Sequence, residues 1–341
     1  MSSTPDIPGV LSAAEVEQSA QSIADLQLPT GEIPWFVGGH CDPWNHVETA
    51  MALDVAGMHD HAERAYEWLV DIQRSDGSWW KYYLPDGSVE EQKLDSNVCA
   101  YVATGVWHHW LCTWDRGFVD HLWPTVERAI DWVLGLRRDD GTILWAITHD
   151  DRPWDYAMLT GSASIAHALH CAVKLAALVN ESRPDWAAAA DVLAHVVATD
   201  PGRFEPKTRW AMDWYYPVLT GALTGEAAKA SLGERWDEFC MEGKGIRCVN
   251  DEPWITASET AECAIAHAAI GDLTTATDLL LWTRSHRRDD GSYWTGIVYP
   301  SLERFPFGET SAYTAAAVIL AADAITGASP ASSVFVPRIA G

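Results

Sequence analysis

A short motif of Asp-Gly followed by tryptophan recurs along the 341-residue sequence and constrains the fold more than any other feature. The copies are QRSDGSWW, RRDDGTILW and RRDDGSYW, at residues 73–80, 137–145 and 287–294, with TDPGRF at 199–204 as a weaker fourth. Each follows a stretch with helical periodicity, and before the first copy Ala62, Ala65 and Leu69 fall on one face. Asp-Gly then ends the helix with a turn. This recurrence predicts an architecture of repeated helical units.

After each turn the sequence predicts a second kind of helix, rich in Ala, Gly, Ser and Thr. The six openings are Asp42, Asp95, Asp155, Asp213, Thr256 and Gly308. Amphipathic stretches alternate with them at residues 12–26, 59–75, 118–138, 185–198, 226–241 and 273–287. Twelve helices alternating in this way predict an all-α fold, an (α/α)6 barrel with six inner and six outer helices, because small residues let the inner set pack closely around an axis. We expect almost no strand, one domain over residues 1–330, and a C-terminal tail over residues 331–341.

Alternation makes the inner helices parallel, so their N-termini should meet at one mouth. Carboxylates at helix N-termini act as caps in any protein, and the cap alone explains each of them equally well. Gathered at one mouth they would also form an acidic ring. The chain has 19 Trp, and many of them lie near these openings. The predicted substrate-binding residues are Trp44, Glu48, Asp95, Asp155, Asp213, Trp214, Tyr215, Trp254 and Glu309. Carboxylates and indoles together suit a neutral, hydroxyl-rich ligand, an oligo- or polysaccharide.

Charge and motif content narrow the classes of partner. The formal net charge of −25 leaves no basic stripe for phosphates, which argues against nucleic acid and against an anionic membrane surface. Seven scattered cysteines without a CxxC, and an N-terminus without a signal-like apolar segment, favour reduced thiols and a cytoplasmic location. No metal or nucleotide motif occurs, so we expect no metal and no cofactor. The oligomeric state stays open.

Hydrolysis of a glycosidic bond needs two carboxyl groups, one acid and one base or nucleophile. Glu262 lies one turn beyond Glu259 in an Ala- and Cys-rich helix, where burial would raise its pKa as a general acid requires. Glu259 is the alternative acid. Asp42 precedes the first inner helix and is either the second carboxyl or a plain N-cap. Openings 1 and 5 are two positions apart around a six-membered ring, which leaves room for a water and favours inversion.

The first repeat resembles the Q-x-x-x-G-x-W motif of squalene and hopene cyclases, at Gln73, Gly77 and Trp79. That family, like the protein prenyltransferases, uses α/α barrels. The chain lacks the D-x-D-D acid motif of the cyclases and the D-x-C zinc motif of the prenyltransferases, so the repeat carries the fold and leaves the cation chemistry unsupported. A terpene cyclase or prenyltransferase-like enzyme acting on a prenyl diphosphate is the alternative function. A non-catalytic carbohydrate-binding barrel is a third.

The whole chain resembles the methylmannose polysaccharide hydrolases of mycobacteria. The resemblance lies chiefly in HCDPWNHVETAMALDVAG at residues 40–57 and SETAECAIAHAAIGD at residues 258–272. It implies a cytosolic (α/α)6 glycoside hydrolase, an endo-acting α-1,4-mannosidase that cuts partly methylated mannose chains by inversion with an Asp/Glu pair. Onto this sequence it carries Asp42 and Glu262. Methoxy groups are apolar, which also suits an indole-rich mouth.

Overall fold

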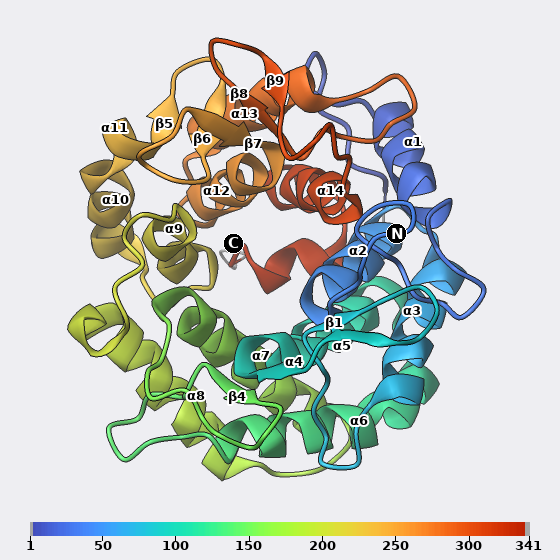
Figure 1. The fold of residues 1–341 in the computed structure, drawn as a ribbon, viewed down its shortest axis with the longest axis vertical. Coiled ribbons are helices and arrows are strands. Elements are labelled where there is room, and N and C mark those ends of the chain that lie inside the picture. Colours follow the sequence, from blue (N-terminus) through green and yellow to red (C-terminus); the bar gives the residue numbers. More distant parts are fainter. Residues whose placement is uncertain (1–2, 338–341) are drawn as a thin grey trace.

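The computed structural model describes residues 3–337, and six inner helices in it form a closed ring (Figure 1). Five positions of the ring are α2 (Pro43–Val55), α7 (Leu159–Leu178), α9 (Met212–Leu219), α12 (Ala257–Ala269) and α14 (Ala312–Thr326), and the sixth is shared by α4 (Ser96–Ala100) and α5 (Val102–Thr113). Each inner helix contacts the next in chain order, and α14 contacts α2, which closes the ring. Small side chains permit this packing: α14 begins AYTAAAVILAA and is buried from Thr314 to Ala324.

The outer helices surround this ring and cover it with their apolar faces. They are α1 (Ala13–Ala24), α3 (His59–Ile72), α6 (Arg116–Leu134), α8 (Pro184–Thr199), α10 with α11 (Gly225–Glu234 and Trp236–Phe239) and α13 (Leu273–Trp282). In α3, the residues Ala62, Ala65 and Leu69 are buried as the periodicity predicted. Three short 3-10 helices complete the helical elements: η1 (Pro201–Arg203), η2 (Thr283–His286) and η3 (Pro330–Val334). The predicted (α/α)6 barrel is confirmed.

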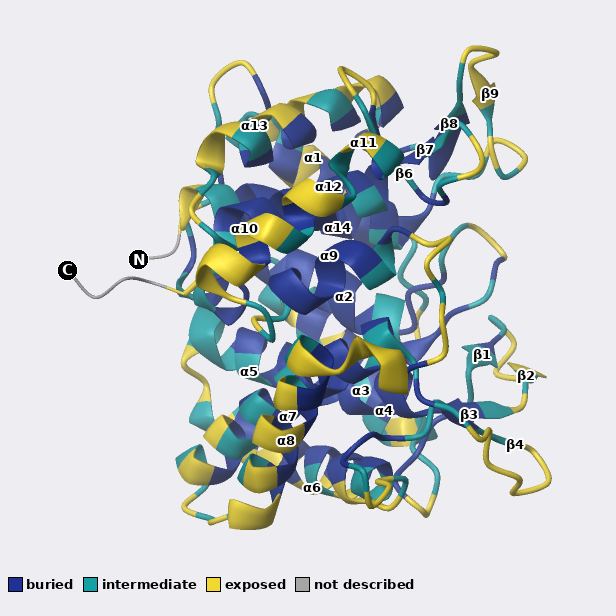
Figure 2. Ribbon diagram, turned by 90° about the vertical axis from the view of Figure 1, so that its left-hand side faces the viewer, coloured by how far each residue is buried: buried dark blue, intermediate teal, exposed yellow. Residues whose placement is uncertain are grey.

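The strands among the described residues are short, two or three residues each, and they occupy the loops at one end of the barrel (Figure 2). They are β1 (Tyr82–Tyr83), β2 (Val89–Glu91), β3 (Lys93–Asp95), β4 (Ala146–Thr148), β5 (Cys240–Met241), β6 (Gly245–Arg247), β7 (Trp254–Thr256), β8 (Gly296–Val298) and β9 (Glu303–Arg304). β1 pairs with β2, β3 pairs with β4, and β5 to β9 form one sheet in chain order, all antiparallel. Since β3 and β7 run directly into α4 and α12, these sheets fix where two inner helices begin.

The recurring Asp-Gly turn has a structural explanation. Gly77 and Gly291 have φ of +96° and +88°, a region that L side chains rarely adopt. A Cβ at Gly77 would lie 2.3 Å from the carbonyl oxygen of Arg128 on α6, and one at Gly291 would lie 2.5 Å from that of Gln18 on α1. The turn therefore needs glycine twice over, once for its backbone conformation and once for its close approach to the next outer helix.

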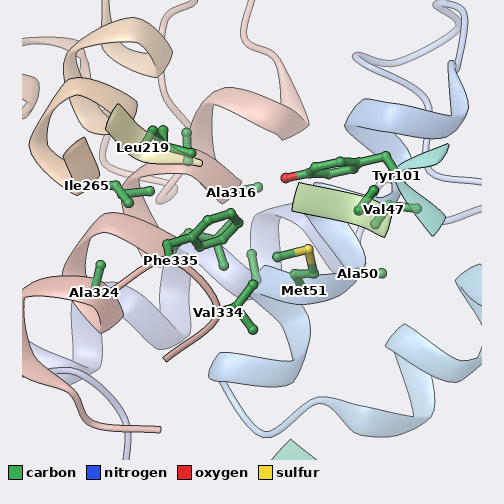
Figure 3. Packing of buried hydrophobic residues seen from close by; sticks show 14 of the residues in the cluster. Val47, Ala50, Met51, Tyr101, Leu219, Ile265, Ala316, Ala324, Val334 and Phe335 are labelled. Atoms are coloured by element: carbon green, nitrogen blue, oxygen red, sulfur yellow. The ribbon is translucent and has the colours of Figure 1, made fainter. Parts of the chain in front are cut away.

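The far end of the barrel is filled by the chain that follows α14. Val334 and Phe335, at the end of η3, are buried beside Met51 of α2 and Ile265 of α12 (Figure 3). Asp323, near the end of α14, accepts hydrogen bonds from the backbone and hydroxyl of Ser329 at 2.7 and 2.6 Å. Val334 and Phe335 belong to the predicted tail, and the domain boundary at residue 330 stays a prediction. Residues 338–341 of the predicted tail lie outside the described residues.

Candidate active site

A groove crosses the mouth of the barrel and consists of two adjoining cavities of about 210 and 340 Å³. Trp44, Lys81 and Met212 line both. The first cavity is otherwise lined by Trp35, Asp42, Asn45, Glu48, Tyr82, Ser258, Glu259, Glu262 and Tyr313, and the second by Asp95, Asn97, Trp145, Met158, Thr160, Gly161, Lys207, Trp210 and Asp213. Four carboxyl groups from α12 and the start of α2 thus meet in one small cavity.

Asp42 is the N-cap of α2, which was one of the two roles predicted for it, and it also lines the first cavity. Its Oδ1 accepts hydrogen bonds from the backbone amides of Trp44 and Asn45, both at 3.0 Å. Its Oδ2 accepts from the Trp35 indole and the Asn45 side-chain amide, both at 2.7 Å. Four donors and the positive end of the helix dipole all stabilise the ionised carboxylate.

Glu262 lies in the second turn of α12, and its side chain is buried at the bottom of the first cavity. The hydroxyl of Tyr215 donates to Oε2 and that of Tyr216 donates to Oε1, the second at 3.3 Å. Burial raises the pKa of Glu262 well above its ordinary value, and repulsion from Glu48 and Glu259 raises it further, against the two tyrosine hydroxyls. The surroundings of Glu262 therefore favour its protonated form over the carboxylate.

Glu48 is a second buried carboxyl and lies in the second turn of α2. Its Oε1 accepts from the Trp44 indole at 3.0 Å and from the Tyr101 hydroxyl at 3.3 Å. Burial raises the pKa of Glu48 to about 8, with a contribution from the negative charge of Asp42. Glu48 and Glu262 are thus two buried carboxyl groups with raised pKa values, and they line the same cavity from α2 and α12.

Glu259 lies one turn before Glu262 on the same helix and differs from it in environment. Its side chain is half-buried, and Oε2 accepts one hydrogen bond from the Ser258 hydroxyl at 2.7 Å. Residues three apart on a helix share a face, so Glu259 and Glu262 approach the cavity from the same wall. Asp42 and Glu48 approach it from α2, which is separated from α12 by α14 in the ring.

The second cavity is bounded by the starts of α4, α7 and α9. Asp95 caps α4, and its Oδ2 accepts from the Trp145 indole at 2.7 Å with Lys81 Nζ at 3.8 Å. Asp213, in the first turn of α9, accepts from the hydroxyl of Thr160 at 2.5 Å, and burial raises the pKa of Asp213. Both carboxyls predicted for this part of the mouth therefore line the groove.

Several predicted substrate-binding residues lie away from the two cavities. Trp214 is buried, stacks on Phe239 and donates its indole N–H to the Ser231 carbonyl at 2.9 Å, so it cannot stack on a sugar. Trp254 packs edge-on against Phe305. Asp155 is exposed in the loop before α7, which begins four residues later than predicted.

Two further predicted residues do not line either cavity and contact the site through other residues or not at all. Glu309 precedes the N-cap of α14 and accepts from the Thr295 hydroxyl at 2.8 Å. Tyr215 is fully buried and reaches the site only through its hydrogen bond to Glu262. The corrections have one physical cause: the sequence places a residue near a helix start but does not fix the direction in which its side chain points.

Some residues that line the groove were not singled out from the sequence, notably Lys81, Asn97, Met158 and Met212. A single lysine, asparagine or methionine in a loop or first helical turn carries no motif. Asn97 follows the cap Asp95 by two residues, which is the one signal that could have placed it at the mouth.

Two kinds of feature are absent from the described part of the chain. Among residues 3–337, no group of three or more His, Cys, Asp or Glu side chains is arranged to hold a metal ion. Within the same residues, no helix has both the length and the apolar character needed to cross a membrane.

A helical ring with carboxyl groups and indoles gathered in an open groove at its mouth defines a glycoside hydrolase of the (α/α)6 class. Comparison with known proteins supports this. The chain is 48% identical, over 98% of its length and 92% of the relative, to the MMP endo-(1,4)-3-O-methyl-alpha-D-mannosidase of Mycolicibacterium hassiacum. The chain belongs to the family of that enzyme. The terpene-cyclase and non-catalytic alternatives are accordingly set aside.

More distant proteins share parts of the sequence or the fold. An uncharacterized glycosyl hydrolase of Methanocaldococcus jannaschii is 27% identical over 48% of this chain and 26% of its own length. A solved structure described as a wild-type glycosidase has a TM-score of 0.73 at 15% identity, with 92% of this chain and 96% of that one covered. A D-mannose isomerase structure has a TM-score of 0.68 at 13% identity, with 94% and 98% covered. Both structures share the fold. No protein-family model matches the chain.

Proposed function

We propose that this chain is an endo-acting α-1,4-mannosidase that cleaves mannose polymers carrying 3-O-methyl groups. The observation that carries the proposal is the 48% identity across nearly the whole chain to an enzyme named for that activity. The groove supports the endo mode, because its two adjoining cavities offer room for successive sugar units on either side of a cleaved bond.

Glu262 is the proposed general acid. Burial and the neighbouring carboxyl groups raise its pKa, which favours a retained proton, and its carboxyl group lines the first cavity, where a glycosidic oxygen would bind. As the bond between the anomeric carbon and this oxygen breaks, the proton passes from Glu262 to the leaving oxygen. The tyrosine hydroxyls of Tyr215 and Tyr216 then stabilise the carboxylate that remains.

Asp42 is the proposed base, on the wall formed by α2. Four donors hydrogen-bond to its carboxyl group, and Oδ2 accepts from two side chains rather than from fixed backbone amides. A water molecule can replace one of these side-chain donors at Oδ2. This water attacks the anomeric carbon, and Asp42 takes the proton that the water loses. Attack from the face opposite the leaving oxygen inverts the configuration. Glu259, half-buried with one hydrogen bond, is the alternative partner.

The same proposal covers the cofactor requirement, the cellular compartment and the partners of the enzyme. We expect it to work without metal or cofactor, because two carboxyl groups and a water suffice for the reaction. All seven cysteines are free thiols, which supports a reducing, cytoplasmic compartment. The net charge of −25 argues against nucleic acid as a partner.

The test is turnover of a 3-O-methylated α-1,4-mannan oligosaccharide by four proteins: wild type, Glu262→Gln, Asp42→Asn and Glu259→Gln. The changes in Glu262 and Asp42 should each lower kcat by at least about a thousandfold, because each removes a proton transfer together with charge stabilisation. Both are nearly isosteric, and circular dichroism should show an unchanged fold. Inverted product configuration is read by NMR in the first seconds of the reaction.

The outcomes separate the assignments. A dead Glu259→Gln beside an active Glu262→Gln would move the acid one turn earlier on α12. A dead Glu259→Gln beside an active Asp42→Asn would make Glu259 the base and leave Asp42 as a helix cap. If wild-type protein cleaves no α-mannan, methylated or not, the proposed substrate is wrong.

A further inference from the structure

The second cavity differs in chemistry from the first. Both cavities hold carboxyl groups and share Met212, but the second adds the thioether of Met158 and the indoles of Trp145 and Trp210. Its carboxyl groups, Asp95 and Asp213, are accompanied by Lys81 and Lys207. Met158 is half-buried at the N-cap position of α7, where its side chain is not needed to fill the core. A flexible, polarisable thioether at the edge of a groove suits a small apolar group better than it suits a hydroxyl.

One polar atom in this cavity has no partner within the chain. Asn97 is only 3% exposed, and its side-chain Oδ1 accepts no hydrogen bond in the described structure. Its backbone N–H is already bound to Asp95 Oδ1 at 3.0 Å. A buried amide oxygen left unpaired costs free energy, and a donor from a bound ligand would recover it. Asn97 is one of the residues that line the second cavity, so a ligand bound there is the group that can supply the missing donor.

Space for that ligand is preserved opposite Asn97. Gly161, in the first turn of α7, also lines the cavity, and a Cβ added there would lie 3.5 Å from the Asn97 Cβ. Any longer side chain at position 161 would therefore extend toward Asn97 and fill the space beside it. The Asp95 carboxylate at the start of the same helix accepts from the Trp145 indole, whereas the Oδ1 of Asn97 has no partner in the described structure.

We propose that the second cavity is the subsite that recognises an O-methylated mannose unit next to the bond being cleaved. Asn97 accepts a hydrogen bond from a hydroxyl of that unit, and Met158 with Met212 contacts its methyl group. Met212 and Trp44 line both cavities, so the recognised unit adjoins the one at the carboxyl groups. This inference rests on the proposed function for the nature of the polymer. It adds the residues that would make the enzyme prefer a methylated unit to an unmethylated one.

The thioethers and the amide of Asn97 should affect substrate binding in different ways. A hydroxyl placed against the two thioethers would lose its hydrogen bonds to water without replacement, whereas a methoxy group there gains apolar contact. The preference for the methylated unit should be about tenfold or more, the usual worth of one methyl group in an apolar pocket. The hydrogen bond to Asn97 serves methylated and unmethylated units alike, so its loss should weaken both.

The experiment measures kcat and KM with methylated and unmethylated α-1,4-mannan oligosaccharides of equal length. Wild-type enzyme should prefer the methylated one in kcat/KM, and Met158→Gln should reduce that preference to near unity through KM. Asn97→Ala should raise KM about tenfold for both substrates and change kcat much less. Met241→Gln is the matched control, because Met241 is half-buried in β5 outside both cavities and its replacement should leave the preference unchanged.

Binding without turnover separates this inference from the proposed function. Calorimetric titration of Glu262→Gln with the same oligosaccharides should show the methyl preference, and Met158→Gln in that background should abolish it. Turnover by wild type with equal kcat/KM for both substrates, or a preference that Met158→Gln leaves intact, overturns the subsite while the hydrolase stands. Methyl-selective binding without wild-type turnover supports the subsite and overturns the hydrolase. Absence of binding by either oligosaccharide overturns both.

Discussion

Replacement of Glu48 by Gln should stabilise the protein in a pH-dependent way. Glu48 is buried beside Trp44 and Tyr101, and its pKa is raised from 4.5 to about 8. A raised carboxyl pKa contributes its full stability below the unfolded pKa near 4.5, and this contribution is lost as pH rises through the folded pKa. Glutamine keeps the shape and has no proton to lose, so it avoids that loss.

The magnitude follows from the same pKa. A rise from 4.5 to about 8 corresponds to roughly 5 kcal/mol, at about 1.4 kcal/mol for each tenfold change in proton affinity. Part of the rise is repulsion from Asp42 and Glu259, and hydrogen bonds from Trp44 and Tyr101 work against it. We therefore expect Glu48→Gln to exceed wild type by about 2–5 kcal/mol in unfolding free energy at pH 8, and by little at pH 5.

Urea unfolding at both pH values, followed by tryptophan fluorescence, measures this difference. The control is Glu234→Gln, since Glu234 is exposed on α10 and its replacement should give the same small effect at both pH values. A Glu48→Gln variant that is less stable than wild type by equal amounts at pH 5 and 8 would refute the reasoning. Glu48 would then be ionised in the folded state, and its two hydrogen bonds would stabilise the anion.

Four shorter predictions follow from the site and the fold. The pH profile of kcat should be bell-shaped, and Glu262→Gln should remove its basic limb, because the raised pKa of that acid sets the limb. Dialysis against EDTA should leave turnover unchanged, and restoration by zinc after a loss would contradict this. Trp35→Phe, which removes one donor to Asp42, should lower kcat about tenfold without loss of fold. Phe335→Ala should lower the unfolding free energy by about 3–5 kcal/mol, measured by urea denaturation, because Phe335 is buried in the core.

The helix order and the ring could be predicted because they depend on local patterns. Small-residue and amphipathic helices alternate in the sequence, and the caps Asp42 and Asp95 begin inner helices as expected. The strands at the mouth could not, because they pair residues far apart in the chain, such as Lys93 with Thr148. Each strand is two or three residues long, too short for an alternating pattern to show.

The direction of several predicted binding side chains could not be read from the sequence, for a reason of helix geometry. Trp214 and Met212 both lie in the first turn of α9, but only Met212 faces the groove, while Trp214 points toward the Ser231 carbonyl. Proximity to a helix start is read from sequence, whereas the rotation of the helix about its axis is set by packing. Glu262 escaped this ambiguity because a carboxyl deep in an Ala- and Cys-rich inner helix has few directions that avoid the core.

The repeated motif and the chemistry occupy different parts of the fold. In the first repeat, Gly77 packs against the Arg128 carbonyl and the Trp79 indole donates to the Leu69 carbonyl at 2.9 Å, so the motif joins one outer helix to the next. Such a device suits any α/α barrel, which explains how the motif of squalene cyclases occurs in a chain of another family. Glu262 lies outside this motif, six residues after the N-cap of α12, and Glu48 lies six residues after the N-cap of α2. The motif therefore identifies the architecture, whereas the candidate catalytic groups lie on the inner helices at the mouth.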